Sequence, residues 1–161
     1  MTQKPNIGNL VGTWTYRSLF NNPNVSTDFR KLEFARAHIS IDDAPMGVFK
    51  GRIFGTDWSL DLDGAIGYGT PWTVFFQANG FTKGAEWLYN FTGYVVPPWP
   101  NGVDQRPAIV GSVTRLRGAA NEPVNIVCSF YAVRTDSRIT SRASRPHVSA
   151  RKPRRHRAAS T

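Results

Sequence analysis

The chain has 161 residues, of which 40% are apolar and 12% aromatic, enough for one domain with its own core. Its formal net charge of +9 is unevenly distributed: residues 1–133 hold 11 Lys and Arg against 10 Asp and Glu, whereas residues 134–161 hold nine against one. Because the body is almost neutral, the charge argues against a nucleic-acid-binding domain and instead marks a basic C-terminal tail.

Cysteine content and hydropathy indicate in which cellular compartment the protein is expected. Cys128 is the only cysteine, so an intrachain disulfide is impossible and a cysteine-based metal centre lacks ligands. No stretch approaches the roughly 18 apolar residues of a membrane helix, and the first residues lack the apolar segment of a secretory signal. We therefore expect a cytoplasmic protein with no membrane association, no metal and no cofactor.

From Leu10 to Arg134, short runs rich in aromatic and β-branched residues alternate with clusters of Gly, Pro, Asn and Asp, a pattern that indicates β-strands. Turn residues between the runs, such as Asn79-Gly80, keep the connections short and favour antiparallel neighbours. No helix is expected between them. The eight predicted strands are Leu10–Phe20, Arg30–Ile41, Gly47–Gly55, Trp58–Gly64, Pro71–Asn79, Glu86–Val95, Pro107–Leu116 and Asn125–Arg134.

Eight strands in a meander leave two open edges unless the sheet closes, and a closed barrel of eight either fills with side chains or holds one small ligand. We predict an all-β fold, an eight-stranded antiparallel up-and-down β-barrel over residues 10–134, with a β-sandwich as the alternative. Residues 1–9 form an N-terminal lead-in. Residues 135–161 hold no aromatic residue to offset the entropy of ordering, so a disordered Arg-rich tail is expected, capable of weak, non-specific, salt-sensitive nucleic-acid binding.

The alternation of side chains separates an inner from an outer face. In Trp58–Gly64, three large apolar residues alternate with Ser59, Asp61 and Asp63, so the two carboxylates belong to the solvated face rather than to an acid–base pair. In the later runs the outer face is also apolar, with Phe75, Tyr94 and Tyr131 as its aromatic members. A large exposed apolar face indicates a partner, and we expect a homo-oligomer, dimer or tetramer, formed through strands five to eight.

Gly12-Thr13-Trp14 at the head of the first strand resembles the start of the calycin barrels, the group that contains lipocalins and avidins. In those families the early Trp closes one end of the barrel, and an Arg or Lys from the last strand lies across its ring. The resemblance implies these structural roles for Trp14 and Arg134. Arg115 is the competing cation, and a guanidinium over an indole stabilises by about 0.5–2 kcal/mol.

Within the calycins, Pro71–Gln77 and Phe91-Thr92-Gly93 resemble the fifth and sixth strands of avidin. Avidins carry small polar residues where this chain has Tyr16, Arg17, Trp87 and Tyr89. The resemblance therefore implies the barrel but not biotin binding.

An inward-facing aromatic set is predicted to line a pocket for a small apolar or aromatic ligand, or else to fill a solid core. Buried Tyr and Trp need hydrogen-bond partners, which favours a partly wet cavity. Trp99, on a loop stiffened by prolines, could cover the barrel mouth or pack against its end. The predicted ligand-binding residues are Tyr16, Trp58, Trp72, Phe76, Trp87, Tyr89, Phe91, Trp99 and Phe130.

Two other functions stay open: a cofactor-free barrel enzyme, an isomerase or cyclase, and a structural or assembly module with a filled barrel. Tyr16, His38 and Tyr89 would be the proton-handling residues of the enzyme. His38 is the only histidine before the tail, but the alternate face of its strand, with Ala37 and Ile39, is at least as apolar, which favours a solvent-exposed His38 over an inward-facing one. Cys128 is expected to be a buried, inert thiol.

Overall fold

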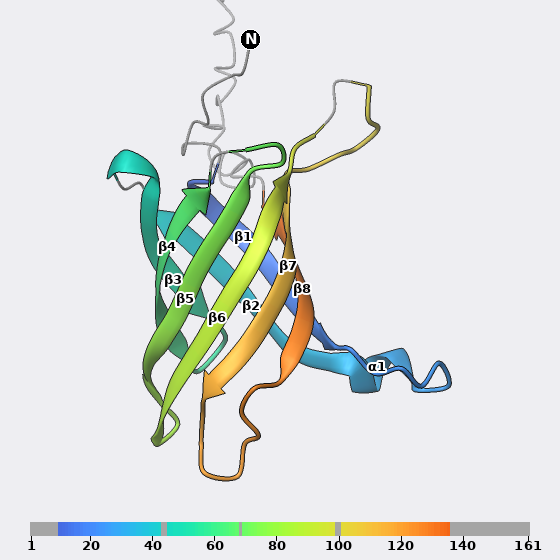
Figure 1. The fold of residues 1–161 in the computed structure, drawn as a ribbon, viewed down its shortest axis with the longest axis vertical. Coiled ribbons are helices and arrows are strands. Elements are labelled where there is room, and N and C mark those ends of the chain that lie inside the picture. Colours follow the sequence, from blue (N-terminus) through green and yellow to red (C-terminus); the bar gives the residue numbers. More distant parts are fainter. Residues whose placement is uncertain (1–9, 43–44, 68, 99–100, 136–161) are drawn as a thin grey trace, which may run out of the picture.

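The computed structural model describes residues 10–42, 45–67, 69–98 and 101–135. Its strands pair antiparallel in chain order and the last pairs with the first, so the sheet closes into a barrel (Figure 1). The predicted all-β, eight-stranded up-and-down barrel is confirmed. The strands are β1 (Gly12–Phe20), β2 (Glu33–Asp42), β3 (Val48–Phe54), β4 (Ser59–Gly67), β5 (Thr73–Thr82), β6 (Ala85–Val96), β7 (Ala108–Arg117) and β8 (Val127–Arg134).

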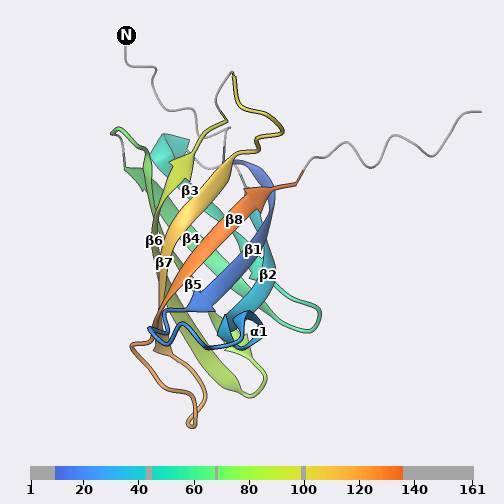
Figure 2. The same ribbon diagram turned by 90° about the vertical axis from the view of Figure 1, so that its right-hand side faces the viewer.

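A short helix, α1 (Phe29–Leu32), lies in the connection between β1 and β2, and a 3₁₀ turn, η2 (Pro45–Gly47), precedes β3. The expectation that no helix interrupts the strands is therefore wrong. Asp28 begins α1, because its carboxylate accepts a hydrogen bond from the Arg30 backbone N–H at 2.9 Å. The connection carrying α1 projects sideways from the barrel wall in Figure 1, and in Figure 2 it lies in front of the lower part of the barrel.

The up-and-down order puts four connections at one end of the barrel: β1–β2, β3–β4, β5–β6 and β7–β8 (lower end in Figure 1). We call this end the mouth. The β5–β6 connection is a tight turn in which Lys83 and Gly84 have φ values of 52° and 76°, the positive values that a type I′ hairpin turn requires. The predicted turn at Asn79-Gly80 is wrong, because β5 continues to Thr82.

Alternate side chains of every strand fill the barrel. On β4, Leu60 and Leu62 are buried while Asp61 and Asp63 are exposed, as the alternation predicts. The middle of the core is aromatic: Phe76 and Phe91 stack with ring centroids 4.4 Å apart, and Phe130 meets Phe91 edge-on at 5.5 Å. This cluster divides the interior between the two ends.

The end opposite the mouth is closed by Trp14. Its side chain is fully buried, and its indole N–H donates to the Leu10 carbonyl at 2.9 Å. The Arg134 guanidinium carbon lies 5.9 Å from the Trp14 ring centroid, and Arg134 donates to the Val11 carbonyl at 2.6 Å. Gly12 has φ +131°, and a Cβ there would lie 3.4 Å from the Arg134 guanidinium. Glycine thus suits both the backbone and the cation at this end.

β8 is followed by one further residue attached to the sheet. The backbone N–H and the hydroxyl of Thr135 both donate to the Thr13 carbonyl. The predicted lead-in, residues 1–9, and the predicted tail beyond Thr135 lie outside the described residues. Within the described part of the chain, no helix has the length and apolar character that crossing a membrane would take.

Candidate functional site: the mouth cavity

A cavity of about 180 Å³ opens at the mouth of the barrel. An engineered protein cavity of about 150 Å³ holds benzene, so the space suits a ligand built on one ring. We call this space the mouth cavity. It is lined by Tyr16, Phe34, Ala35, Ile53, Trp58, Leu60, Thr82, Lys83, Trp87, Tyr89, Phe91 and Arg115.

A β-bulge on β2 aims Phe34 at the cavity. Ser18 pairs with Ala35 and Leu19 pairs with Glu33, so Phe34 is the extra residue with no partner on β1. Regular alternation would turn one of two consecutive residues outward, but Phe34 and Ala35 both line the cavity.

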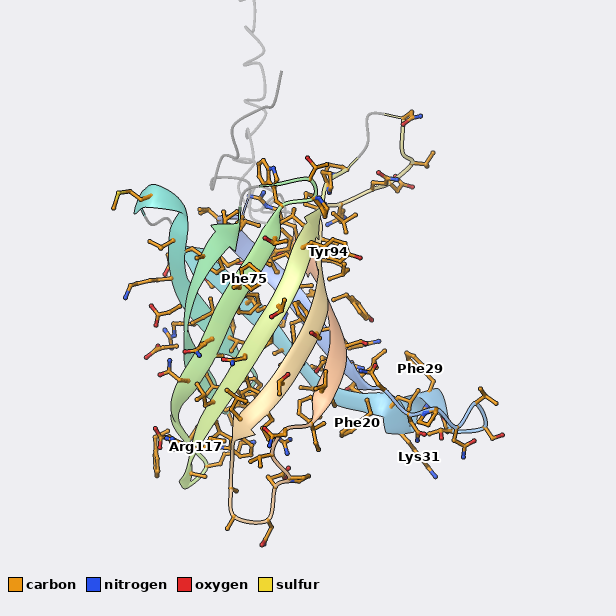
Figure 3. All side chains as sticks on the ribbon, viewed as in Figure 1. Phe20, Phe29, Lys31, Phe75, Tyr94 and Arg117 are labelled. Carbon is orange, nitrogen blue, oxygen red and sulfur yellow. The ribbon has the colours of Figure 1, made fainter. Side chains whose placement is uncertain are left out.

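A second irregularity, on β7, fixes the direction of two arginines. Tyr89 pairs with Arg115 and Leu88 pairs with Arg117, which leaves Leu116 as the extra residue. Arg115 is buried in the barrel, whereas Arg117 is exposed and its guanidinium lies 2.6 Å from a carboxylate oxygen of Glu86. Figure 3 shows Arg117 near the lower end of the barrel, on the outer wall.

Aromatic rings form the wall and the floor of the mouth cavity. Trp87 and Tyr89 lie parallel with centroids 6.1 Å apart, and Phe34 meets Tyr89 edge-on at 6.4 Å. Beneath them Phe91 meets Tyr16 edge-on at 6.0 Å. The Trp87 indole N–H donates to the Thr82 carbonyl at 3.1 Å, so this polar atom of the wall is satisfied.

Arg115 is the buried charged group of the cavity wall. Its side chain is only 9% exposed. One terminal nitrogen donates to the Glu122 carboxylate at 2.5 Å and to the Pro123 carbonyl at 3.2 Å, which ties the β7–β8 connection to the mouth. The guanidinium carbon lies 4.8 Å from the Phe34 ring centroid and 5.6 Å from that of Trp87, both within range of cation–π attraction.

The two tyrosines of the cavity hold their protons firmly. Burial raises the pKa of Tyr16 well above its ordinary value, and burial also raises the pKa of Tyr89, against a smaller opposing effect of the nearby Arg115 cation. At neutral pH both phenols are therefore hydrogen-bond donors and not bases.

The structure brings together five of the nine predicted ligand-binding residues. Tyr16, Trp58, Trp87, Tyr89 and Phe91 all line the mouth cavity. Three of the other four, Trp72, Phe76 and Phe130, are not among the described residues that line it.

Phe76 and Phe130 are buried in the aromatic cluster beneath the cavity floor. Trp72 precedes β5 at the opposite end of the barrel, where its carbonyl accepts from the Val95 N–H at 2.9 Å. Grouping Trp72 with the cavity lining was incorrect, because the alternation of β5 gives its face but not its height in the barrel. Trp99 lies outside the described residues.

His38 does not lie in the cavity. It is exposed on the outer face of β2, with its ring stacked on Phe54 at 5.7 Å, while Ala37 and Ile39 are buried. A proton-handling role for His38 in the cavity is therefore wrong, and the solvent-facing interpretation is right. Cys128 is buried, and burial raises the pKa of its thiol. No set of three His, Cys, Asp or Glu side chains in the described ranges is placed to hold a metal ion.

Sequence reasoning missed Arg115 and Lys83 as lining residues and considered Arg115 only as a cation for Trp14. A signal was present: Arg115 continues the inward face of β7 after Ile109 and Val113, which are 1% exposed. A charge on an otherwise apolar inner face at the end of a strand indicates a polar group in a cavity. Lys83 carried no such signal, since the turn was expected elsewhere.

Comparisons of this chain with models of known protein families, with curated protein sequences and with solved structures find no match.

Proposed function

We propose that this protein binds a small apolar or aromatic molecule in the mouth cavity, in the manner of a calycin-like barrel. The observation that carries the proposal is the cavity itself, about 180 Å³ of space bordered by aromatic rings at one end of a barrel whose other end is closed by Trp14. Small-molecule sites are typically concave and apolar, with a few polar groups that orient the ligand. Tyr16, Tyr89 and Arg115 are those groups here.

The barrel geometry supports the calycin resemblance without extending it to a ligand. Trp14 under Arg134, at the start of β1 and the end of β8, is the arrangement that the resemblance implies. The bulky residues Tyr16, Trp87 and Tyr89 border the cavity, which disfavours a ligand of biotin's size.

The two alternative functions receive less support. A structural module with a filled barrel leaves the mouth cavity without a purpose. A cofactor-free isomerase or cyclase loses His38, the one imidazole among its proposed catalytic groups, because His38 lies on the outer face of β2. Its remaining candidates, Tyr16 and Tyr89, are weak acids that stay protonated, so the cavity offers donors for binding more readily than a base for proton abstraction.

The test is titration with toluene, a neutral one-ring probe, followed by the tryptophan indole N–H signals in ¹H–¹⁵N NMR spectra. We expect the signals of Trp58 and Trp87 to shift and that of Trp14, at the closed end, to stay in place. Ala35→Leu fills the cavity and should abolish the shifts. Thr114→Leu places the same side chain, leucine, on the outer face of β7, away from the cavity, and should preserve them. If toluene shifts neither Trp58 nor Trp87, the proposed function is wrong.

A further inference from the structure

The Arg115 guanidinium has an unused donor. Its Nε–H is buried and has no hydrogen-bond partner among the described residues, although one terminal nitrogen binds Glu122 and Pro123. A buried donor without a partner is destabilising, and native proteins rarely keep one without a reason. Arg115 lines the mouth cavity, so a ligand bound there lies beside this guanidinium group.

The charge around the cavity favours an anion. Among the described lining residues there are two cations, Lys83 and Arg115, and no carboxylate. Lys83 is paired with Asp57 outside the lining, with 3.1 Å between ammonium nitrogen and carboxylate oxygen. Arg115 is also paired, with Glu122, but it is the buried one of the two cations, so salt screens its attraction for an anion in the cavity less.

The Phe34 and Trp87 rings lie against the guanidinium and fix its position. Aromatic rings attract a cation through their faces, and this leaves the N–H edges of the planar group for hydrogen bonds. A guanidinium held in this way suits a carboxylate, which accepts charge-assisted hydrogen bonds from it.

We propose that the ligand of the mouth cavity is an aromatic or apolar carboxylic acid, whose ring lies among Trp58, Trp87 and Tyr89 and whose carboxylate binds Arg115. The inference rests on the proposed function and deepens it. Glu122 is the internal competitor for the same cation. Its side chain is 45% exposed, so it can turn toward solvent when a ligand carboxylate arrives.

The experiment compares phenylacetate with its neutral isostere phenylacetamide, by the same NMR titration of the folded full-length chain. Phenylacetate should bind about tenfold more tightly, the scale of one hydrogen bond to a charged group. Arg115→Gln should remove the preference. Arg117→Gln, which deletes the exposed arginine two residues away, should preserve it.

A second variant, Glu122→Gln, tests the same inference even if Arg115→Gln does not fold. Glu122→Gln removes the competing carboxylate from the surface, so phenylacetate should bind several times more tightly while phenylacetamide binding stays unchanged. Equal affinity for the two probes, or a preference that survives in Arg115→Gln, overturns the carboxylate inference but leaves the proposed function intact. If toluene, phenylacetate and phenylacetamide all fail to bind, the proposed function is overturned as well.

Discussion

Trp14 is the largest fully buried side chain of the closed end. Trp14→Ala would leave a cavity between Leu10 and Arg134 that the strand backbones cannot fill, and it would free the carbonyl that now accepts the indole N–H. We expect a loss of about 3–5 kcal/mol in the free energy of unfolding, measured by urea denaturation. Thr13→Ala, on the exposed face of the same strand, should cost about 0.5 kcal/mol or less. Similar losses in the two variants would show that Trp14 does not close the barrel.

Tyr16 gives the barrel a dependence on alkaline pH. The unfolded chain ionises this phenol near its ordinary pKa of 10.0, whereas burial raises the pKa in the folded state. Above the unfolded pKa of 10.0, the unfolded state binds fewer protons than the folded state. The free energy of unfolding therefore falls, by about 1.4 kcal/mol per pH unit for one such group. The stabilising effect is fully present below the unfolded pKa and is lost as pH rises toward the folded pKa.

The check is urea denaturation of the wild type and of Tyr16→Phe across this range. The difference in unfolding free energy between them should be constant below about pH 9 and should shift in favour of the variant at higher pH. Tyr89, whose pKa burial also raises, adds a slope that both proteins share. A difference that stays constant at all pH values would contradict the burial effect at Tyr16.

At the scale of elements, the β5–β6 hairpin depends on its turn. Gly84 has φ +76°, a conformation that costs any residue with a Cβ, and the space around it is open. Gly84→Ala should therefore destabilise the protein by about 1 kcal/mol through backbone strain alone. Gly69→Ala is the matched control, since Gly69 is exposed and lacks a positive φ. Thermal unfolding measures both variants, and Gly69→Ala should be neutral or slightly stabilising.

The sequence was enough to predict the strands because their inward residues keep a period of two. On β4, Leu60 and Leu62 point inside while Asp61 and Asp63 point outside. A shift of one residue would turn both aspartates into the core, so this pattern fixes which face is buried. Strand ends were predicted less well. Asn79-Gly80 has the composition of a turn, yet the pairing of Gly80 with Trp87 and of Thr82 with Ala85 extends the hairpin to Lys83-Gly84. Long-range pairing outweighed local turn preference.

The site was predicted only in part for a related reason. Alternation assigns a residue to the inside but not to an end of the barrel, so Trp72 was grouped with Trp58 although the two lie at opposite ends. The bulges at Phe34 and Leu116 are set by pairing with β1 and β6, and no local feature of the sequence marks them. Arg115 therefore appeared as a possible cover for Trp14 and not as part of the mouth.

For the whole molecule, the two ends of the barrel differ in structure: one is filled by side chains and the other is open. The closed end stacks a cation on a fully buried indole, with Arg134 bonded to the chain beside it. The mouth stacks a cation on two rings beside an open space. The aromatic cluster of Phe76, Phe91 and Phe130 separates them, so a change at the mouth should affect the proposed ligand binding before it affects stability.

The basic tail stays a prediction, because it lies outside the described residues. If it binds nucleic acid, a chain ending at Thr135 should lose RNA retention that the full chain shows at low salt, and the retention of the full chain should fall steeply as salt rises. Equal retention by the two chains would exclude the tail as the binding segment.

The outer wall offers a surface for self-association. Phe75, Tyr94 and Tyr131 are 50%, 45% and 38% exposed, and Tyr94 pairs with Val110, which pairs in turn with Tyr131 across β6, β7 and β8. Figure 3 shows Phe75 and Tyr94 close together on the outer side of β5 and β6. Exposed aromatic rings in one continuous area are typical of an interface. The predicted homo-oligomer would bury this area against a second copy of the chain.

Sedimentation velocity at micromolar concentration tests the oligomer. The wild type should sediment as a dimer or tetramer, and the double variant Phe75→Ser/Tyr94→Ser should sediment as a monomer with the same far-UV circular dichroism. Phe81→Ser is the control: Phe81 is 75% exposed but lies near the mouth end of β5, away from the patch, so its loss should leave the oligomer intact. A wild-type monomer, or equal dissociation by both substitutions, would mean that this face is not the interface. Because the mouth cavity opens at the barrel end and not on this wall, toluene binding should survive in the monomeric variant.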